Sequence, residues 1–277
     1  MFNDKLKNIK IIAKELYTRF IEHEISYSAG RIAYFFILSV FPFLIFVNAI
    51  IASLNIPGDA AISFLEPLFP EQIVSFIALY LEYINGENAL PLLSFGIVLS
   101  PFSASKAIRS LMHAFELAYG EQHRRRFFSQ IIFSMLFIIL SAVIFTFCVA
   151  VVALGNDFVS TLISDMPFNL AFIDLFSLWR WVTMALIMFI TLSLVYKLIP
   201  SSKVKFSETL PGCIFALLSF LIFTAGFSFY VNNIASASVF YGTVGAVMLF
   251  MLWMYFAGII ITLGAELNKI VSDLKKR

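Results

Sequence analysis

Lys106, Arg109 and His113 are the residues whose types and spacing best suit the binding of an anion. With Glu116 they follow a spacing of three, four and three residues, which places them on one face of a helix. Lysine and arginine side chains bind phosphate groups, so this stripe predicts contact with an anionic headgroup. The alternative is a charged helix face that is simply turned to water, and we favour it for the stripe taken alone.

A second candidate is an ion pair at Glu266. Glu266 directly follows a long uncharged segment, and Arg31 directly precedes another. A charge near apolar surroundings is stable only when it is paired and hydrogen-bonded. We therefore hypothesise that Glu266 pairs with Arg31 or Arg109, either as a structural latch, which we rank first, or as part of a gate.

Pro42 and Asn48 form a third candidate, inside the first long apolar segment. Proline removes one backbone hydrogen bond from a helix and kinks it. A polar side chain about a turn and a half further on could then complete a kinked polar site. The alternative, which we favour, is that Asn48 makes a hydrogen bond between helices.

Catalytic patterns are missing from the sequence. His23, His113 and His123 are scattered, and Cys148 and Cys213 fit neither metal-ligand nor disulfide spacing. The sequence also lacks the GxxxxGK[ST] phosphate loop, the GxSxG elbow and the HExxH zinc motif. We expect no catalytic residues, no metal site and no cofactor.

The composition predicts a membrane protein. Of the 277 residues, 61% are hydrophobic and 13% are charged, and the mean hydropathy is +0.93. Soluble domains are typically about 45–50% apolar and about 25% charged, so much of this surface belongs in lipid. No linker divides the chain, and we predict one all-α membrane domain over residues 1–277.

Six apolar segments are candidates for membrane-spanning helices, which need roughly 20 residues each. The last two are separated by a polar break that includes Asn232 and Asn233. The predicted spans are residues 32–54, 88–105, 127–154, 180–199, 210–230 and 242–263.

The positions of lysine and arginine support this count. Apart from Arg180, they lie at both ends of the chain and in every second connection between spans. Basic connections stay in the cytoplasm, so both termini are predicted to be cytoplasmic.

Two further segments are amphipathic. Residues 1–30 form a predicted cytoplasmic segment whose helix either lies on the membrane near anionic lipid or packs against the bundle, and we weigh these alternatives equally. Residues 70–85 are predicted to form an interfacial or re-entrant helix.

Several short motifs stand out in and around the apolar segments. They are AGRIAYFFILSVFP at residues 29–42, AYG at 118–120, YGTVG at 241–245, LWMY at 252–255 and GAELN at 264–268. Together they resemble the motifs of the YihY/BrkB family of bacterial inner-membrane proteins. The SAG sequence at residues 28–30 is less rich in alanine than the family's usual first-span motif. The resemblance covers nearly the whole chain and implies a multi-pass protein of the bacterial cytoplasmic (inner) membrane. Family members have carried the labels ribonuclease BN, virulence factor BrkB and transporter.

We interpret the chain as a transporter-like protein that moves or handles lipid or another amphiphilic or anionic substrate. Membrane lipids are its expected partners, with anionic lipid at the cytoplasmic face contacted by Lys106, Arg109 and His113. A homo-oligomer is compatible with the sequence, and nucleic acid is not an expected partner. The first alternative is a non-catalytic scaffold for envelope assembly, and the second is a membrane enzyme. We reject the ribonuclease interpretation, because neither metal-binding carboxylates nor a pair of histidines occur together.

Overall fold

The structure is a computed structural model of the chain. All regular elements in the residues that it describes are helices, which confirms the predicted all-α fold class. The described residues are 2–53, 62–63, 65–66, 71–84, 105–120, 128–141, 143–144, 146–147, 185–201, 204–233 and 237–276.

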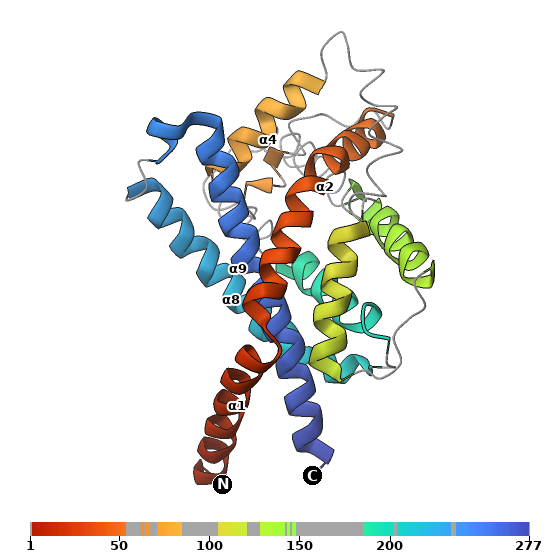
Figure 1. The fold of residues 1–277 in the computed structure, drawn as a ribbon, viewed down its shortest axis with the longest axis vertical. Coiled ribbons are helices and arrows are strands. Elements are labelled where there is room, and N and C mark those ends of the chain that lie inside the picture. Colours follow the sequence, from red (N-terminus) through yellow and green to blue (C-terminus); the bar gives the residue numbers. More distant parts are fainter. Residues whose placement is uncertain are drawn as a thin grey trace, which may run out of the picture.

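The last helix is the centre of the fold (Figure 1). It runs for 40 residues without a proline and contacts each of the other labelled helices. The most extensive of these contacts are with α8 and α2. The labelled helices are α1 (Phe2–Glu22), α2 (Ile25–Ser53), α4 (Glu71–Ile84), α8 (Phe206–Asn233) and α9 (Ala237–Lys276).

Three shorter helices complete the described fold: residues 105–119, Phe128–Ser141 and Ala185–Leu198. Their side chains meet α2, α8 and α9 in one hydrophobic core. At its centre the rings of Phe115 and Tyr196 stack with centroids 5.6 Å apart. This core holds the candidate site residues of the 105–119 helix close to α2 and α9.

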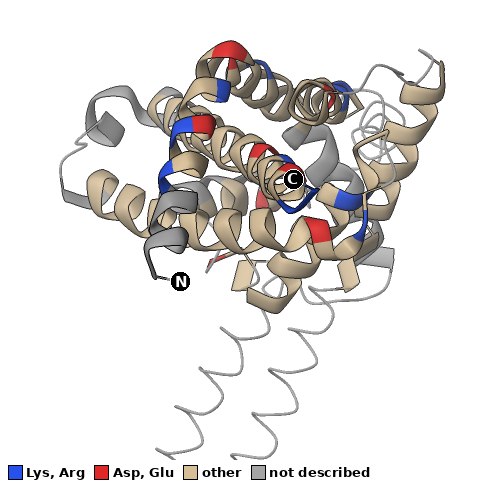
Figure 2. Cartoon of the chain, turned by 90° about the horizontal axis from the view of Figure 1, so that it is seen from below, with Lys and Arg blue, Asp and Glu red and all other residues tan. Residues whose placement is uncertain are grey.

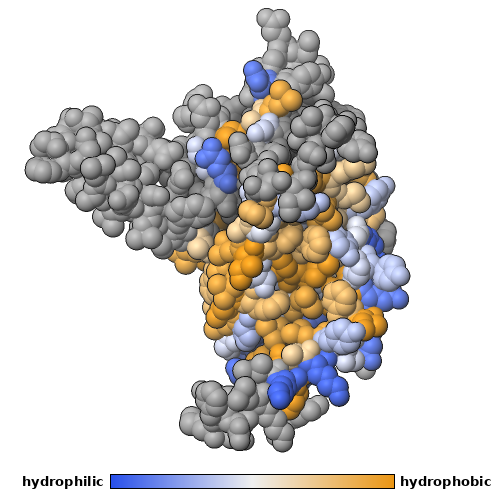
Figure 3. Space-filling view, turned by 90° about the vertical axis from the view of Figure 1, so that its left-hand side faces the viewer, coloured by the Kyte–Doolittle hydropathy of each residue, from blue (hydrophilic) through white to orange (hydrophobic). Residues whose placement is uncertain are grey.

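Within the described residues, two helices are long and apolar enough to cross a membrane: Phe206–Val231 and Val247–Lys276. On the face shown in Figure 3, hydrophobic side chains form a broad band above hydrophilic ones. Only 17% of the most apolar 18-residue stretch of Phe206–Val231 is buried within the protein. Most of this helix therefore presents apolar side chains outward. The predicted spans 210–230 and 242–263 lie within α8 and α9. The predicted break between them includes residues 234–236, which lie outside the described part of the chain, so it stays a prediction.

The count of six spans stays a prediction. The first predicted span coincides with α2 up to Ser53. The described parts of the third and fourth spans, Phe128–Ser141 and Ala185–Leu198, are apolar but shorter than a full crossing. The second span lies outside the described residues except for Ser105.

The start of α1 and the end of α9 lie at the same end of the molecule (Figure 1). Charged residues of several helices gather there, as Figure 2 shows in a view of that end. Helix α1 packs against α9 and α2, which favours the packed alternative for this amphipathic segment over the one lying on the membrane. Helix α4 confirms that most of residues 70–85 is helical, while its interfacial position remains a prediction.

Candidate functional site

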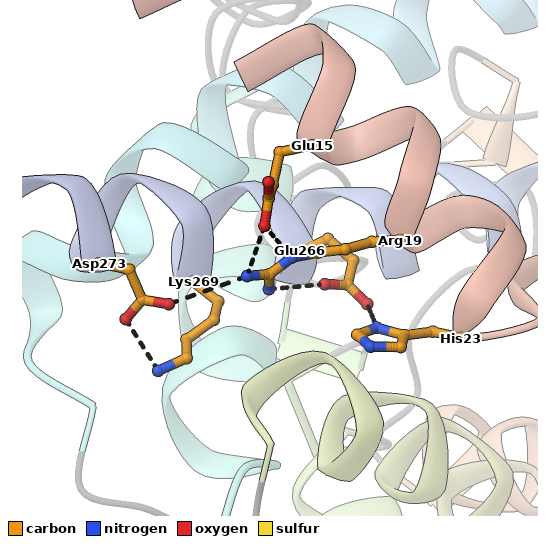
Figure 4. Close-up of polar contacts among 6 residues, drawn as sticks. All are labelled: Glu15, Arg19, His23, Glu266, Lys269 and Asp273. Atoms are coloured by element: carbon orange, nitrogen blue, oxygen red, sulfur yellow. Dashed lines mark hydrogen bonds and ion pairs between the residues drawn. The ribbon is translucent and has the colours of Figure 1, made fainter. Parts of the chain in front are cut away.

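The most extensive charged cluster in the described part of the chain lies between α1 and α9 (Figure 4). Its centre is Glu266, whose side chain is fully buried. Arg19 Nη1 donates a hydrogen bond to Glu266 Oε2 at 3.2 Å, and His23 Nδ1 lies 2.5 Å from Glu266 Oε1. Each carboxylate oxygen of Glu266 therefore has its own partner, Arg19 on α1 and His23 directly after it, as a buried charge requires.

The cluster extends outward along both helices. Arg19 also contacts Glu15 Oε1 at 3.4 Å and Asp273 Oδ2 at 3.8 Å. Lys269 Nζ donates to Asp273 Oδ1 at 2.9 Å. Exposed pairs of this kind contribute about 0–1 kcal/mol each, so the buried contacts of Glu266 dominate the energy of the cluster.

These partners correct the hypothesis that Glu266 pairs with Arg31 or Arg109. Helix α1 ends at Glu22, and a turn at His23 and Glu24 leads into α2 without reversing the direction of the chain (Figure 1). Arg19 and His23 therefore lie before this turn, where they contact Glu266 on α9. Arg31 follows that turn on α2 and contacts the 105–119 helix instead. The structure therefore supports a latch at Glu266, but one that fastens α1.

A signal for this pairing is present in the sequence. One set of charged or basic residues repeats every four residues: Glu15, Arg19 and His23. A second set is spaced by three and then four residues: Glu266, Lys269 and Asp273. Each set occupies one face of its helix. Two helix faces with alternating charges are suited to pack against each other, and the sequence interpretation missed this match.

The stripe of Lys106, Arg109 and His113 lies on the 105–119 helix, as predicted. Arg31 Nη2 lies 3.3 Å from His113 Nδ1 and joins the stripe from α2. Arginine can only donate hydrogen bonds, so His113 accepts this one through an unprotonated Nδ1. Arg109 Nε donates to the carbonyl oxygen of Ser105 at 3.3 Å. Four basic side chains on two helices thus lie in one region, which we call the basic group.

Glu116 belongs to the same helical face but has a different environment. It is 6% exposed, and it accepts a hydrogen bond from Gln130 Nε2 at 3.2 Å. The helix ends at Gly120, whose φ of 64° suits glycine. The carboxylate is thus turned toward the Phe128–Ser141 helix, while Lys106 and Arg31 remain exposed.

The GAELN motif at residues 264–268 forms a close crossing of three helices. Asn268 Oδ1 accepts a hydrogen bond from Gly212 N on α8 at 2.6 Å. Tyr196 Oη donates to the carbonyl oxygen of Ile261 at 3.0 Å. A side chain at Gly212 would meet the backbone of Gly264, and one at Gly264 would meet Tyr196. The glycines therefore allow the helices to approach closely, and Asn268 and Tyr196 fix their alignment.

The other candidate residues are not brought into a site. Pro42 and Asn48 lie within α2, but their side chains fall outside the described residues, so the kinked polar site stays a prediction. The described residues contain no group of three or more His, Cys, Asp and Glu that could hold a metal ion. Cys213 is buried, with Sγ 3.3 Å from Ser193 Oγ.

Comparisons with known proteins identify the family. The family model described as Virulence factor BrkB matches residues 16–277. The chain is 33% identical to the ribonuclease-like protein YfkH of Bacillus subtilis (strain 168), over 95% of this chain and 96% of that protein. It is 23% identical to a UPF0761 membrane protein of Mannheimia succiniciproducens, over 98% of this chain and 92% of the relative. No solved structure matches the chain significantly.

The family match covers the main elements of the site. It begins within α1, before Arg19 and His23, and continues through the end of α9. Relatives are named membrane proteins, and α8 and α9 are apolar enough to cross a bilayer, so this is a membrane protein. The resemblance inferred from the sequence motifs is confirmed: the chain belongs to the virulence factor BrkB family.

Proposed function

We propose that the protein is a transporter-like membrane protein that handles or moves lipid or another anionic amphiphile. The basic group would contact the anionic headgroup through Lys106, Arg109 and His113, with Arg31 as a fourth contact. The observation that carries this proposal is the 3.3 Å contact between Arg31 Nη2 and His113 Nδ1. It brings a cation from α2 to a stripe that lies on another helix.

The balance of charge in this region favours an anion. Arg31 and Lys106 are exposed, and Arg109 and His113 are half-buried. Glu116, the acidic residue of the same face, is buried against Gln130. Phosphate oxygens accept charge-assisted hydrogen bonds from arginine and lysine, which are stronger than those between neutral groups. A phosphate-bearing headgroup is therefore the class of ligand that fits best.

Lipid transport by purified protein in liposomes tests the proposal. The protein should move labelled phospholipid or a small anion faster than empty liposomes do. Lys106→Gln/Arg109→Gln should reduce this rate about tenfold, because a hydrogen bond to a charged group contributes about 1.5–3 kcal/mol. Lys10→Gln/Lys14→Gln is the matched control, since it removes two exposed charges from α1.

The control variant should transport at the wild-type rate. A complete lack of flux above empty liposomes, for phospholipid and for small anions, would refute the transport proposal. Equal losses in both double variants would instead show that the effect is general surface charge and would exclude a specific role for the basic group.

We also propose an inner-membrane location with both termini in the cytoplasm. The common location of the start of α1 and the end of α9 supports this orientation (Figure 1). In a chain with Cys148 and Cys213 replaced by alanine, Lys10→Cys and Lys275→Cys should react with an impermeant maleimide only after cells are opened. Glu82→Cys, in the predicted outer loop, should react in intact cells. Labelling of the two termini from opposite sides would contradict the orientation.

RNA cleavage is the activity suggested by the name of one relative, which is called ribonuclease-like. We propose that this chain is not an enzyme. Glu266 is bound on both oxygens by Arg19 and His23, which leaves it poorly placed to act on a substrate. Purified protein should leave labelled RNA intact. Cleavage that disappears in His113→Gln would show that the basic group is catalytic.

A further inference from the structure

A small cavity of about 80 Å³ opens between the start of α8 and the end of α9. It lies on different helices from the basic group. Its lining combines charged, hydroxyl and apolar side chains from the two helices: Glu208, Pro211, Val271, Ser272, Lys275 and Lys276.

The acidic side chain in this cavity is held in place by its own hydrogen bonds. Glu208 Oε2 accepts a hydrogen bond from the backbone N–H of Lys205 at 3.1 Å. Ser272 Oγ donates to Glu208 Oε1 at 3.4 Å. These contacts are directed at the carboxylate from the backbone of Lys205, which directly precedes α8, and from the side chain of Ser272 on α9. Glu208 is therefore a fixed part of the wall.

The charge around the cavity is positive on balance. Lys275 and Lys276 line it together with the single carboxylate of Glu208. A net positive hollow favours a ligand that carries negative charge, such as a phosphate group.

An apolar track leads away from the cavity along α8. Pro211 in the lining is followed on the same side of the helix by Ile214, Leu218 and Ile222, at spacings of three, four and four residues. These three side chains are 52%, 54% and 73% exposed. In a membrane protein, such a surface contacts hydrocarbon. The surface thus passes from charged residues at the cavity to apolar residues along α8. A lipid molecule has the same order of parts, with a charged headgroup followed by an apolar acyl chain.

We propose that this cavity binds the headgroup of an anionic phospholipid of the surrounding bilayer, with an acyl chain along Ile214, Leu218 and Ile222. The phosphate would interact with Lys275 and Lys276. A free phosphate ion would use the charged rim but not the apolar track. The proposal depends on the membrane location of the protein and not on whether it transports a substrate.

Native mass spectrometry of the protein released from mixed-lipid nanodiscs tests this site. Nanodiscs with equal amounts of phosphatidylglycerol and phosphatidylcholine offer the protein both headgroup classes. The wild-type protein should retain phosphatidylglycerol preferentially. Lys275→Gln/Lys276→Gln should reduce that retention at least about fivefold, because each lysine near anionic lipid contributes about 1 kcal/mol. Lys10→Gln/Lys14→Gln should not change it.

Two further arms separate the sources of the signal. Leu218→Asn, which interrupts the track while leaving both lysines in place, should also lower phosphatidylglycerol retention. Excess inorganic phosphate should not displace the lipid. Unchanged retention in the Lys275/Lys276 variant, equal loss in the α1 control, or displacement by inorganic phosphate would each overturn the proposal. The thermal unfolding temperature of each variant, expected to match the wild type, excludes loss of fold as the cause.

Discussion

Arg19→Met is expected to lower the free energy of unfolding of this protein by about 3 kcal/mol or more, because it leaves a buried carboxylate short of its cation. Glu266 is 0% exposed. It would keep only the contact with His23 Nδ1, and Oε2 would lose the hydrogen bond from Arg19 Nη1. Methionine preserves the apolar volume of the arginine stem, so the loss reports mainly on charge.

The other contacts of Arg19 should matter little. Glu15 and Asp273 have side chains that are 49% and 36% exposed, and solvent screens pairs of that kind. Glu15→Gln is therefore the matched control on the same helix, with an expected change below about 0.5 kcal/mol. Thermal and denaturant unfolding in detergent micelles measures both variants.

A second substitution separates the buried charge from general packing. Glu266→Gln in the Arg19→Met background removes the uncompensated charge, so the double variant should be more stable than Arg19→Met alone. The charge swap Arg19→Glu/Glu266→Arg should likewise be more stable than either single reversal. If Arg19→Met unfolds at the same temperature as Glu15→Gln, the latch between α1 and α9 is wrong.

The features that the sequence could predict are those that depend on one helix at a time. The stripe of Lys106, Arg109 and His113 follows from helical spacing alone, and the structure places it on one helix. That helix ends at Gly120, because the residue that ends a helix often has a left-handed backbone conformation, which glycine adopts most easily. The polar residues that include Asn232 and Asn233 divide the long apolar run into two predicted spans, which lie within α8 and α9.

The partner of Glu266 could not be chosen from charge alone. Several cations were predicted to lie near the same end of the bundle. The spacing of Glu15, Arg19 and His23 marks a charged helix face, but it does not show which helix that face contacts. The angle of α1 is set by the turn between α1 and α2, where Glu24 has a φ of 49°. Such a conformation is uncommon for a residue other than glycine, so the direction of α1 relative to α9 was not apparent from the sequence.

The close crossing at Gly212 and Gly264 was also beyond the sequence pattern. Helices α8 and α9 are apolar on nearly all sides across their spans. A uniformly apolar helix gives no sign of which side faces a neighbour. The motif at residues 264–268 marked the region, but the structure was needed to show which glycine meets which helix.

Gly212→Ala is expected to destabilise the protein by about 3 kcal/mol or more, since overpacking that cannot relax costs at least about 1–3 kcal/mol. The added methyl group would overlap the carbonyl oxygen of Gly264, and Asn268 Cγ would lie 2.7 Å from it. A backbone atom in the middle of α9 cannot move aside without separating the helices. Thermal unfolding in detergent should show the loss directly.

Gly226→Ala is the matched control in the same helix. A methyl group at Gly226 would meet nothing within 4 Å, so alanine should be neutral or stabilise α8 by about 0.5–1 kcal/mol through its better helix propensity. Similar losses for Gly212→Ala and Gly226→Ala would mean that α8 responds to alanine in general, and the close crossing would then be wrong.

Gly264→Ala should be as damaging as Gly212→Ala but should respond differently to a second substitution. Its methyl group would overlap the hydroxyl of Tyr196, which is held by Ile261 and by stacking on Phe115. Tyr196→Phe alone should cost about 1 kcal/mol through the lost hydrogen bond. In the Gly264→Ala background, however, it removes the overlapping oxygen and should restore part of the stability.

That rescue should be partial and specific. Tyr196 Cζ would still lie 2.8 Å from the new methyl group, closer than unstrained contacts allow. Tyr196→Phe should not rescue Gly212→Ala, whose obstacle is the backbone of α9. A rescue of Gly264→Ala but not of Gly212→Ala is therefore the pattern that distinguishes this arrangement of the three helices from a general sensitivity to packing. If Tyr196→Phe adds its own cost to Gly264→Ala, the helices cross in a different register.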